Sequence, residues 1–353
     1  MAHDTSLDCA AWLHSYQDFH RADRHSRHAN YIVYTCRENM PGTHNHCLGL
    51  GDRFRHIAFM LRLAAATQRI LLIDWASPLP LERYFSPASI DWRLTTQEFV
   101  KTRAEPVLRW GITKKPLPST RYVRIVGNMQ WSSMLASYEP SNSTMNSNFL
   151  APSFSCLWRF MFTPSAFLEA QIREQRRLIF GVEHAPYNAI HLRMGDGAPG
   201  SAFDLRTVPK SDVRLDRREA EKVLGCVANY SSLPVFLATD NAHLKTTVMG
   251  GMLPFQRRGE QQTHRPVLVH NFTGMVNPVF KHNFSTAAVD SSFIDLGLIV
   301  QATCLFVHTI APGGGWSIRL SSFTTTAIAW AGEQKCLKKV CWRGHRPIMP
   351  DKL

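Results

Sequence analysis

The chain has no long apolar run. None of its segments reaches the roughly 18 consecutive apolar residues that a membrane-spanning helix needs. It has no internal repeats and no low-complexity tract, which argues against repeat architectures and long disordered regions. The first 29 residues are rich in His, Asp and Arg and contain no apolar signal-peptide core. A luminal location would therefore require a targeting segment that this chain does not show.

The chain has fewer acidic than basic residues. The 353 residues carry a formal charge of +13, and 44% of them are hydrophobic, enough for two globular domains. Nucleic acid, an anionic membrane surface and a phosphorylated small molecule all suit such a charge. The densest basic clusters (Arg173–Arg177, Arg214–Arg218 and Lys335–Arg346) are short and interrupted. Because aromatic residues do not interleave with them, nucleic-acid binding is not expected as the main role.

Cysteines and glycosylation triplets hint at the secretory pathway. The chain has eight cysteines and four Asn-X-Ser/Thr triplets, at Asn142, Asn229, Asn271 and Asn283. We expect local disulfides Cys36–Cys47 and Cys336–Cys341, with Cys226 and Cys304 buried in apolar segments. His44 and His46 beside Cys36 and Cys47 fit no common zinc spacing. A Cys36–Cys47 bridge or free thiols is therefore preferred over a metal site.

The first half of the chain begins with a β-loop-α-β pattern. Tyr31–Cys36 and Arg69–Trp75 are typical of buried strands, and apolar residues from Phe54 to Ala65 recur at helical spacing between them. That order requires a parallel strand pair. The helix is expected to place Arg53 and His56 on its polar side.

A second α/β layer follows. Thr163-Pro164 is typical of a helix start, with Thr as N-cap, and Gly181 of its end. Strands are predicted at Ala189–Arg193, Pro234–Thr239, Pro266–His270 and Cys304–His308, alternating with helices. We therefore expect an α/β protein with two domains and a cleft between them. The boundaries are residues 1–165, 166–330 and a basic, cysteine-containing tail at 331–353.

The segment His191-Leu192-Arg193-Met194-Gly195-Asp196 carries the strongest functional signal. Since side chains alternate along a strand, His191 and Arg193 point the same way. An Arg and a His at the mouth of a parallel strand, followed by Gly-Asp, suit a diphosphate. The alternative is an edge-strand Arg paired with a carboxylate.

Two glycine-containing loops are further anion-binding candidates. Gly49-Leu50-Gly51-Asp52 lies between a strand and a helix, where backbone amides favour an anion. The third glycine of a dinucleotide fingerprint is missing, and Asp52 as a helix cap is the alternative. Gly313-Gly314-Gly315-Trp316-Ser317 follows a strand, and its amides and the Ser317 hydroxyl could approach a phosphate.

Three further polar residues could contact a ligand. Asp240 and Asn241 end a predicted strand, where ligands bind in open α/β sheets, or they cap the next helix. Asp295 lies in an apolar helix, so its carboxylate needs a partner, either a cap-like bond or a ligand hydroxyl. No Asp-x-Asp occurs in the chain. A diphosphate would therefore be neutralised by Arg193 and helix termini rather than by carboxylate-held Mg²⁺.

Together these motifs resemble those of a known enzyme superfamily. Gly49-Leu50-Gly51-Asp52 with Leu72-Ile73-Asp74-Trp75 resembles the N-terminal motif of the bacterial nodulation-factor α1,6-fucosyltransferase. His191-x-Arg193-x-Gly195-Asp196 resembles the His-x-Arg motif of α1,2-, α1,6- and protein O-fucosyltransferases. Ala238–Asn241 and Asp295 with Gly315-Trp316-Ser317 resemble two later motifs in the same order. The resemblance covers about residues 30 to 330 as islands, without the stretch from about 78 to 185.

The resemblance implies a GT-B fold: an N-terminal Rossmann-like domain on the acceptor side and a C-terminal one that binds GDP-fucose. It implies an inverting glycosyltransferase with no metal or other cofactor, in the lumen of the Golgi or endoplasmic reticulum. Arg193 would stabilise the leaving GDP. His191, Gly49, Gly51, Asp240, Asn241, Asp295, Gly315, Trp316 and Ser317 would complete the donor site.

The sequence departs from the family in one stretch. The α1,6 branch has a catalytic Glu shortly after its His-x-Arg motif, whereas residues 197–201 here read Gly-Ala-Pro-Gly-Ser. Asp52 lies near the position at which protein O-fucosyltransferases have an Asn or Glu, so the resemblance makes it the first candidate base, with Asp196 and Asp204 in reserve. A GT-B enzyme with another nucleotide-sugar donor and a non-catalytic GDP-binding relative are the alternatives.

Overall fold

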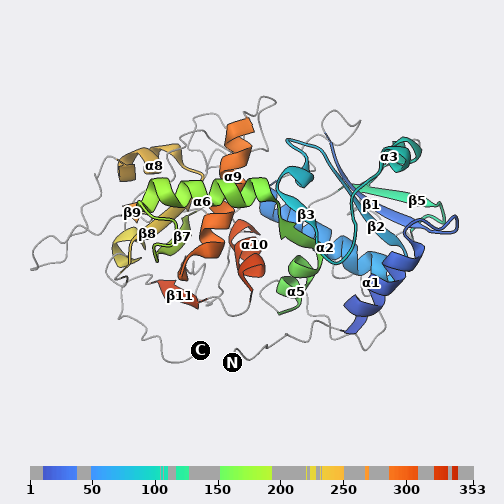
Figure 1. Cartoon of the computed structure of the whole chain (residues 1–353), viewed down its shortest axis with the longest axis horizontal. Coiled ribbons are helices and arrows are strands. Elements are labelled where there is room, and N and C mark those ends of the chain that lie inside the picture. Colours follow the sequence, from blue (N-terminus) through green and yellow to red (C-terminus); the bar gives the residue numbers. More distant parts are fainter. Residues whose placement is uncertain are drawn as a thin grey trace, which may run out of the picture. The chain divides into compact units, whose positions relative to one another are not determined.

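The structure is a computed structural model of the whole chain (Figure 1). It describes residues 11–37, 49–103, 105, 107–109, 117–126, 152–192, 220, 223–227, 231, 233–249, 267–269, 286–308, 322–332 and 336–340. Within these ranges, no helix has the length and apolar character needed to cross a bilayer.

The chain divides into two compact units. Unit 1 comprises Met1–Leu168 and Ile328–Glu333, and unit 2 comprises Glu169–Ala327 and Gln334–Leu353. The first border lies three residues after the one expected from the sequence, and a short C-terminal segment returns to unit 1. The tail expected at 331–353 is thus split between the units.

Unit 1 is built on a four-stranded parallel sheet, ordered β2-β1-β5-β4. Its strands are β1 (Tyr31–Cys36), β2 (Ile70–Trp75), β4 (Val107–Arg109) and β5 (Tyr122–Val126). β1 and β2 are fully buried, as their apolar and β-branched residues predict. The parallel β1–β2 pair and the helix between them, α2 (Leu50–Ala66), confirm the predicted β-α-β unit.

The face of α2 that was expected to be polar is partly buried, so that expectation was wrong. Arg53 is 4% exposed and His56 is fully buried. The Arg53 guanidinium donates a 2.6 Å hydrogen bond to the Ser77 carbonyl and lies over the Trp75 ring. Burial lowers the pKa of Arg53 to about 10. A pattern based on charge alone misses this, because a guanidinium can be buried when a carbonyl and a ring receive it.

Shorter elements complete unit 1. They are α1 (Ala11–Asp23), the 3₁₀ turn η1 (Leu81–Arg83), β3 (Phe85–Pro87), α3 (Thr96–Arg103), α5 (Pro152–Met161) and β6 (Phe162–Pro164). β3 and β6 pair antiparallel. Aromatic rings gather beside this pair: Phe54 lies 4.6 Å from Trp158, which stacks on Trp330 at 5.8 Å between ring centroids. Through these contacts Trp330 packs in unit 1.

The predicted start of the next helix was wrong by two residues. Thr163-Pro164 belongs to β6, and the helix is α6 (Ala166–Phe180). Its first turn is capped by Ser165, whose Oγ accepts a 3.2 Å hydrogen bond from the Leu168 amide. The predicted end is confirmed: Gly181 follows the helix with φ +78°, a left-handed conformation that favours glycine.

Unit 2 contains a five-stranded parallel sheet, ordered β11-β10-β7-β8-β9. Its strands are β7 (Asn188–Leu192), β8 (Val235–Thr239), β9 (Val267–Leu268), β10 (Cys304–His308) and β11 (Cys336–Val340). Its helices include α8 (Ala242–Met249), α9 (Thr286–Gln301) and α10 (Ser322–Ala331), of which α10 ends in unit 1. α9 packs on β7 and β8. The predicted strands are present, so the α/β class with parallel sheets is confirmed and fits a GT-B type of fold.

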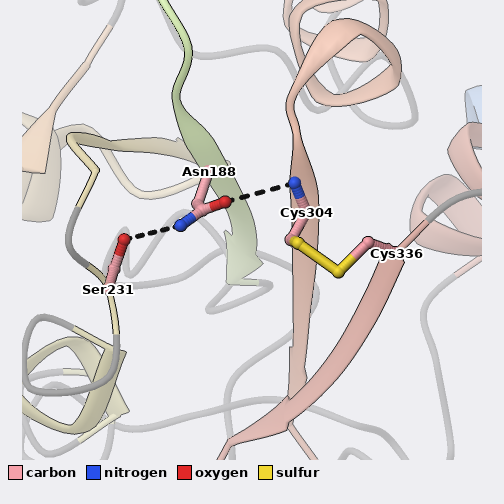
Figure 2. The surroundings of a disulfide bond; sticks show 4 residues. All are labelled: Asn188, Ser231, Cys304 and Cys336. Atoms are coloured by element: carbon pink, nitrogen blue, oxygen red, sulfur yellow. Dashed lines mark hydrogen bonds between the residues drawn. A yellow bond between two sulfur atoms is a disulfide. The ribbon is translucent and has the colours of Figure 1, made fainter.

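β11 and its disulfide correct the predicted pairing of cysteines. Cys304 on β10 is bonded to Cys336 on β11, so Cys336 does not pair with Cys341 (Figure 2). The two cysteines face each other across neighbouring strands, a proximity that spacing along the chain cannot reveal. Cys36 is disulfide-bonded, but Cys47 lies outside the described residues, so their pairing stays a prediction. Cys226 is a partly buried thiol that forms no disulfide.

Asn188 links three segments beside this disulfide. Its side-chain amide donates a 2.6 Å hydrogen bond to Ser231 Oγ, and its oxygen accepts one of 3.2 Å from the Cys304 amide (Figure 2). The side chain is 3% exposed, so these bonds satisfy a buried amide. Asn188 thereby fixes the start of β7 against β10.

Candidate functional site

The strand order of unit 2 marks one place where a ligand is expected. From β7 the chain proceeds to β8 and β9 on one side, and then crosses back to β10 and β11 on the other. The order therefore reverses between β7 and β10. In open α/β sheets, ligands bind at the carboxyl ends of the strands where the order reverses. The candidate site is built around the carboxyl end of β7.

His191 lies at that point. It is the one residue of β7 that is not fully buried, since the residues on either side have no access to solvent. Its Nδ1 lies 2.9 Å from Thr324 Oγ1, and its ring packs on Phe323 at 4.8 Å between centroids. Both contacts come from the first turns of α10, the helix that follows β10. His191 therefore connects the carboxyl end of β7 with α10, the helix that follows β10 in the chain.

Asp240 and Asn241 follow β8 directly, as expected. Asn241 Oδ1 accepts a 2.8 Å hydrogen bond from the Leu244 amide, which makes Asn241 the N-cap of α8. This agrees with the capping alternative for Asn241. Asp240 is half-buried between the strand and this cap.

Asp295 has a partner that the sequence did not indicate. Its Oδ2 lies 3.5 Å from the ammonium of Lys245, and the side chains are 9% and 8% exposed. The sequence suggested a cap-like bond or a ligand hydroxyl as the partner of Asp295. The buried ammonium of Lys245 on α8 is a partner of a third kind. The contact with the Lys245 ammonium holds the Asp295 carboxylate in one orientation.

The glycine-containing segment of unit 1 forms the start of α2. Gly49 is the N-cap with ordinary extended angles, and Gly51 is buried within the first turn. Asp52 also lies in the first turn, so it is not the cap. Its carboxylate lies 3.8 Å from the Arg55 guanidinium and is 28% exposed. A partly exposed carboxylate at a helix N-terminus can accept a proton from a bound ligand.

Several predicted site residues lie outside the described residues. They are Arg193, Asp196, Asp204, Gly315, Trp316 and Ser317, together with the histidines considered for zinc. Arg193 and its neighbours follow β7 directly in the chain, and the glycine-rich segment follows β10. Among the described residues, no group of three or more His, Cys, Asp or Glu side chains is arranged to hold a metal ion.

Sequence reasoning missed Thr324, Phe323 and Lys245. Thr324 is 133 residues from His191 along the chain, and no local pattern connects the two. Lys245 lies near the capped start of α8, where a lysine side chain is ordinarily exposed to solvent. The available signal was weak in both cases: a threonine triplet and a lysine within apolar helices.

The sequence matches no protein-family model and no curated protein. Solved structures do match. A mutant of FUT1 from Arabidopsis thaliana, in complex with GDP, aligns with a TM-score of 0.52 and 14% identity over 95% of this chain and 79% of that one. That similarity shows the fold.

Two structures of the fucosyltransferase NodZ also align. The one from Bradyrhizobium has a TM-score of 0.45 and 15% identity, over 84% of this chain and 92% of that chain. NodZ α-1,6-fucosyltransferase soaked with GDP-fucose has a TM-score of 0.42 and 14% identity, over 84% and 91%. The structural neighbours are thus fucosyltransferases.

Proposed function

We propose that this chain is a fucosyltransferase that moves fucose from GDP-fucose to a hydroxyl of a glycan or protein acceptor. The reaction is inverting and needs no metal. Each of the two units is a Rossmann-like domain of a GT-B enzyme, and unit 2 binds the donor. The enzyme works in the lumen of the secretory pathway, where a disulfide such as Cys304–Cys336 is stable.

The position of the His191-x-Arg193 motif carries this proposal. His191 lies at the carboxyl end of β7, where the strand order of unit 2 reverses, and Arg193 is the second residue after it. Nucleotides bind at such points in open α/β sheets. The fold is shared with FUT1, which was solved in complex with GDP.

The chemistry requires a fixed cation at the leaving group. When the bond from the anomeric carbon to the diphosphate breaks, negative charge develops on the β-phosphate, and the leaving group needs charge stabilisation rather than a proton. A guanidinium meets two phosphate oxygens with two parallel hydrogen bonds. Arg193 takes this role. Because the sequence has no Asp-x-Asp, arginine and helix termini replace a carboxylate-held metal.

His191, Asp240, Asn241 and Asp295 bind or order the nucleoside side of the donor, while Gly315, Trp316 and Ser317 contact the diphosphate. In unit 1, Gly49 and Gly51 open the helix that presents Asp52. Asp52 is the candidate base for the acceptor hydroxyl, since it is the partly exposed carboxylate of that first turn. Asp196 and Asp204 are the next candidates.

The stretch 197–201 favours a second hypothesis. It contains no Glu, although the α1,6 branch has its catalytic Glu there. A relative that binds GDP without transferring fucose would show this departure. Donor hydrolysis separates the two hypotheses and requires no knowledge of the acceptor.

The test is release of GDP and fucose from GDP-fucose, with EDTA present, by the wild type and by Arg193→Ala. We expect slow release by the wild type and a loss of at least a hundredfold in the variant, the usual effect of removing one group that stabilises transition-state charge. The configuration of the fucose, read by ¹H NMR before it equilibrates, should be inverted.

The outcomes separate the hypotheses. Equal release by Arg193→Ala overturns the mechanism. GDP binding without release by the wild type supports the non-catalytic relative. Release from UDP-glucose instead of GDP-fucose assigns another nucleotide-sugar donor.

A further inference from the structure

His191 is held by a specific side chain of α10. The 2.9 Å bond between His191 Nδ1 and Thr324 Oγ1 lies next to the 4.8 Å packing of the imidazole on Phe323. Thr324 is 5% exposed, so its hydroxyl is removed from bulk water. A buried hydroxyl and an imidazole nitrogen stabilise each other more there than they would at the surface.

We propose that Thr324 is a positioning residue for donor binding and acts through His191. The hydrogen bond fixes the plane of the imidazole at the reversal between β7 and β10. The Thr324 hydroxyl can donate to a bare Nδ1 or accept from a protonated one, so the bond fixes the position of Nδ1 in either neutral tautomer. This inference rests on the proposed role of His191 in the donor site.

The geometry explains why one hydroxyl matters. His191 is the partly accessible residue at the end of a buried strand, so its ring needs a constraint from outside the strand. Phe323 packs on the ring, but an aromatic contact does not fix the directions in which the ring nitrogens point. The hydrogen bond to the Thr324 hydroxyl fixes the position of Nδ1. A ligand then meets a ring that is already oriented, which lowers the entropy lost on binding.

The chain provides a matched control in the same helix. Thr325 follows Thr324 and is similarly buried, at 7% exposure against 5%. Thr→Val keeps the shape and removes the hydroxyl at either position. Both variants remove one buried hydroxyl from α10, whereas only Thr324→Val removes the hydrogen bond to His191. Thr324→Ser retains the hydroxyl and tests rescue.

The experiment measures GDP binding by isothermal titration for the wild type, Thr324→Val, Thr324→Ser and Thr325→Val, well below their unfolding temperatures. In parallel, a long-range ¹H–¹⁵N spectrum reports the tautomer of His191. We expect about tenfold weaker binding for Thr324→Val, the size of one lost hydrogen bond, and changed His191 ring-nitrogen shifts. Thr324→Ser and Thr325→Val should stay within about twofold of the wild type. If Thr324→Val does not fold, Thr324→Ala is measured in its place.

Two results overturn the inference. One is unchanged GDP binding and unchanged His191 shifts in Thr324→Val, and the other is an equal loss of binding in Thr325→Val, which would mean that α10 packing is responsible. A wild type that binds no GDP contradicts the proposed function instead. In that case the His191 spectrum still decides whether the Thr324 hydroxyl is hydrogen-bonded to Nδ1 and orients the ring.

Discussion

At the scale of single residues, the buried ion pair of Lys245 and Asp295 is sensitive to mutation. Removing one partner of such a buried pair costs about 3–5 kcal/mol. We expect Lys245→Met to lower the free energy of unfolding by about that amount in urea titrations. Lys245→Arg, which keeps the charge, should cost less.

An exposed pair provides the control. Arg177 and Glu174 lie 2.8 Å apart with side chains 57% and 47% exposed. Such pairs contribute up to about 1 kcal/mol, so Arg177→Met should change stability little. Equal losses for Lys245→Met and Arg177→Met would contradict the structural role given to the buried pair.

His20 on α1 makes unit 1 sensitive to acid. Burial lowers the pKa of this imidazole from 6.5 to about 4. Between those pH values the unfolded chain binds a proton that the folded chain does not, so stability falls as the pH drops through this window. The shift corresponds to about 3 kcal/mol. His20→Gln should therefore flatten the dependence of the urea midpoint on pH between 5 and 7.

His184 is the matched control for that pH series, since its side chain is 88% exposed. His184→Gln should leave the pH dependence as it is in the wild type. A His20→Gln protein that keeps the full acid sensitivity would show that another group causes it.

The sequence predicted individual site residues better than their partners. His191 was recognisable because it stands in a motif at the end of an apolar run, and the structure places it at the strand end. Lys245 and Thr324 were not recognisable, because each acts on a residue far away in the chain. Pairing across a fold leaves no local pattern in one sequence.

At the scale of elements, the disulfide between Cys304 and Cys336 fastens an edge strand. The bond closes a segment of 32 residues, for which chain-entropy arguments give a stabilisation of about 3–4 kcal/mol. We expect the Cys304→Ala, Cys336→Ala double variant to lose about that free energy of unfolding and therefore to unfold at a lower urea concentration. The amides of β11 should exchange with solvent much faster, because the strand has a neighbour on one side only.

Cys226→Ala is the control for this variant, since Cys226 lies in the same unit and forms no disulfide. It should keep the exchange rates of β11 unchanged. Unchanged protection of β11 in the double variant would show that the strand is held by the sheet alone. Reduction of the wild type is a poorer test, because Cys36 and Cys156 are disulfide-bonded as well.

Elements with a strong apolar pattern were predicted, and ambiguous ones were not. β1 and β10 agree with the sequence because apolar, β-branched and aromatic residues fill them. Thr163-Pro164 fits both a helix start and a strand edge, and the antiparallel partner β3 decides for the strand. β11 contains two lysines, which resemble a solvated tail until β10 is seen beside it.

At the scale of the whole molecule, parallel α/β organisation followed from the alternation of strands and helices. The strand order did not, because a sequence states that strands are parallel but not on which side each new strand is added. That order is what locates the reversal beside β7 in unit 2. The strand order is what makes the His191-x-Arg193 motif a candidate ligand site, since the same motif at a sheet edge would not indicate one.

The most direct test of the central claim is isothermal titration of the protein with GDP and GDP-fucose in EDTA, for the wild type and Arg193→Ala. UDP-glucose and GDP-mannose serve as competing donors. We predict that the wild type binds guanine nucleotides specifically and in the presence of EDTA. Binding by Arg193→Ala should be at least about tenfold weaker, because a charge-assisted bidentate contact is lost. Absence of nucleotide binding by the wild type, or binding that Arg193→Ala leaves intact, would contradict the central claim.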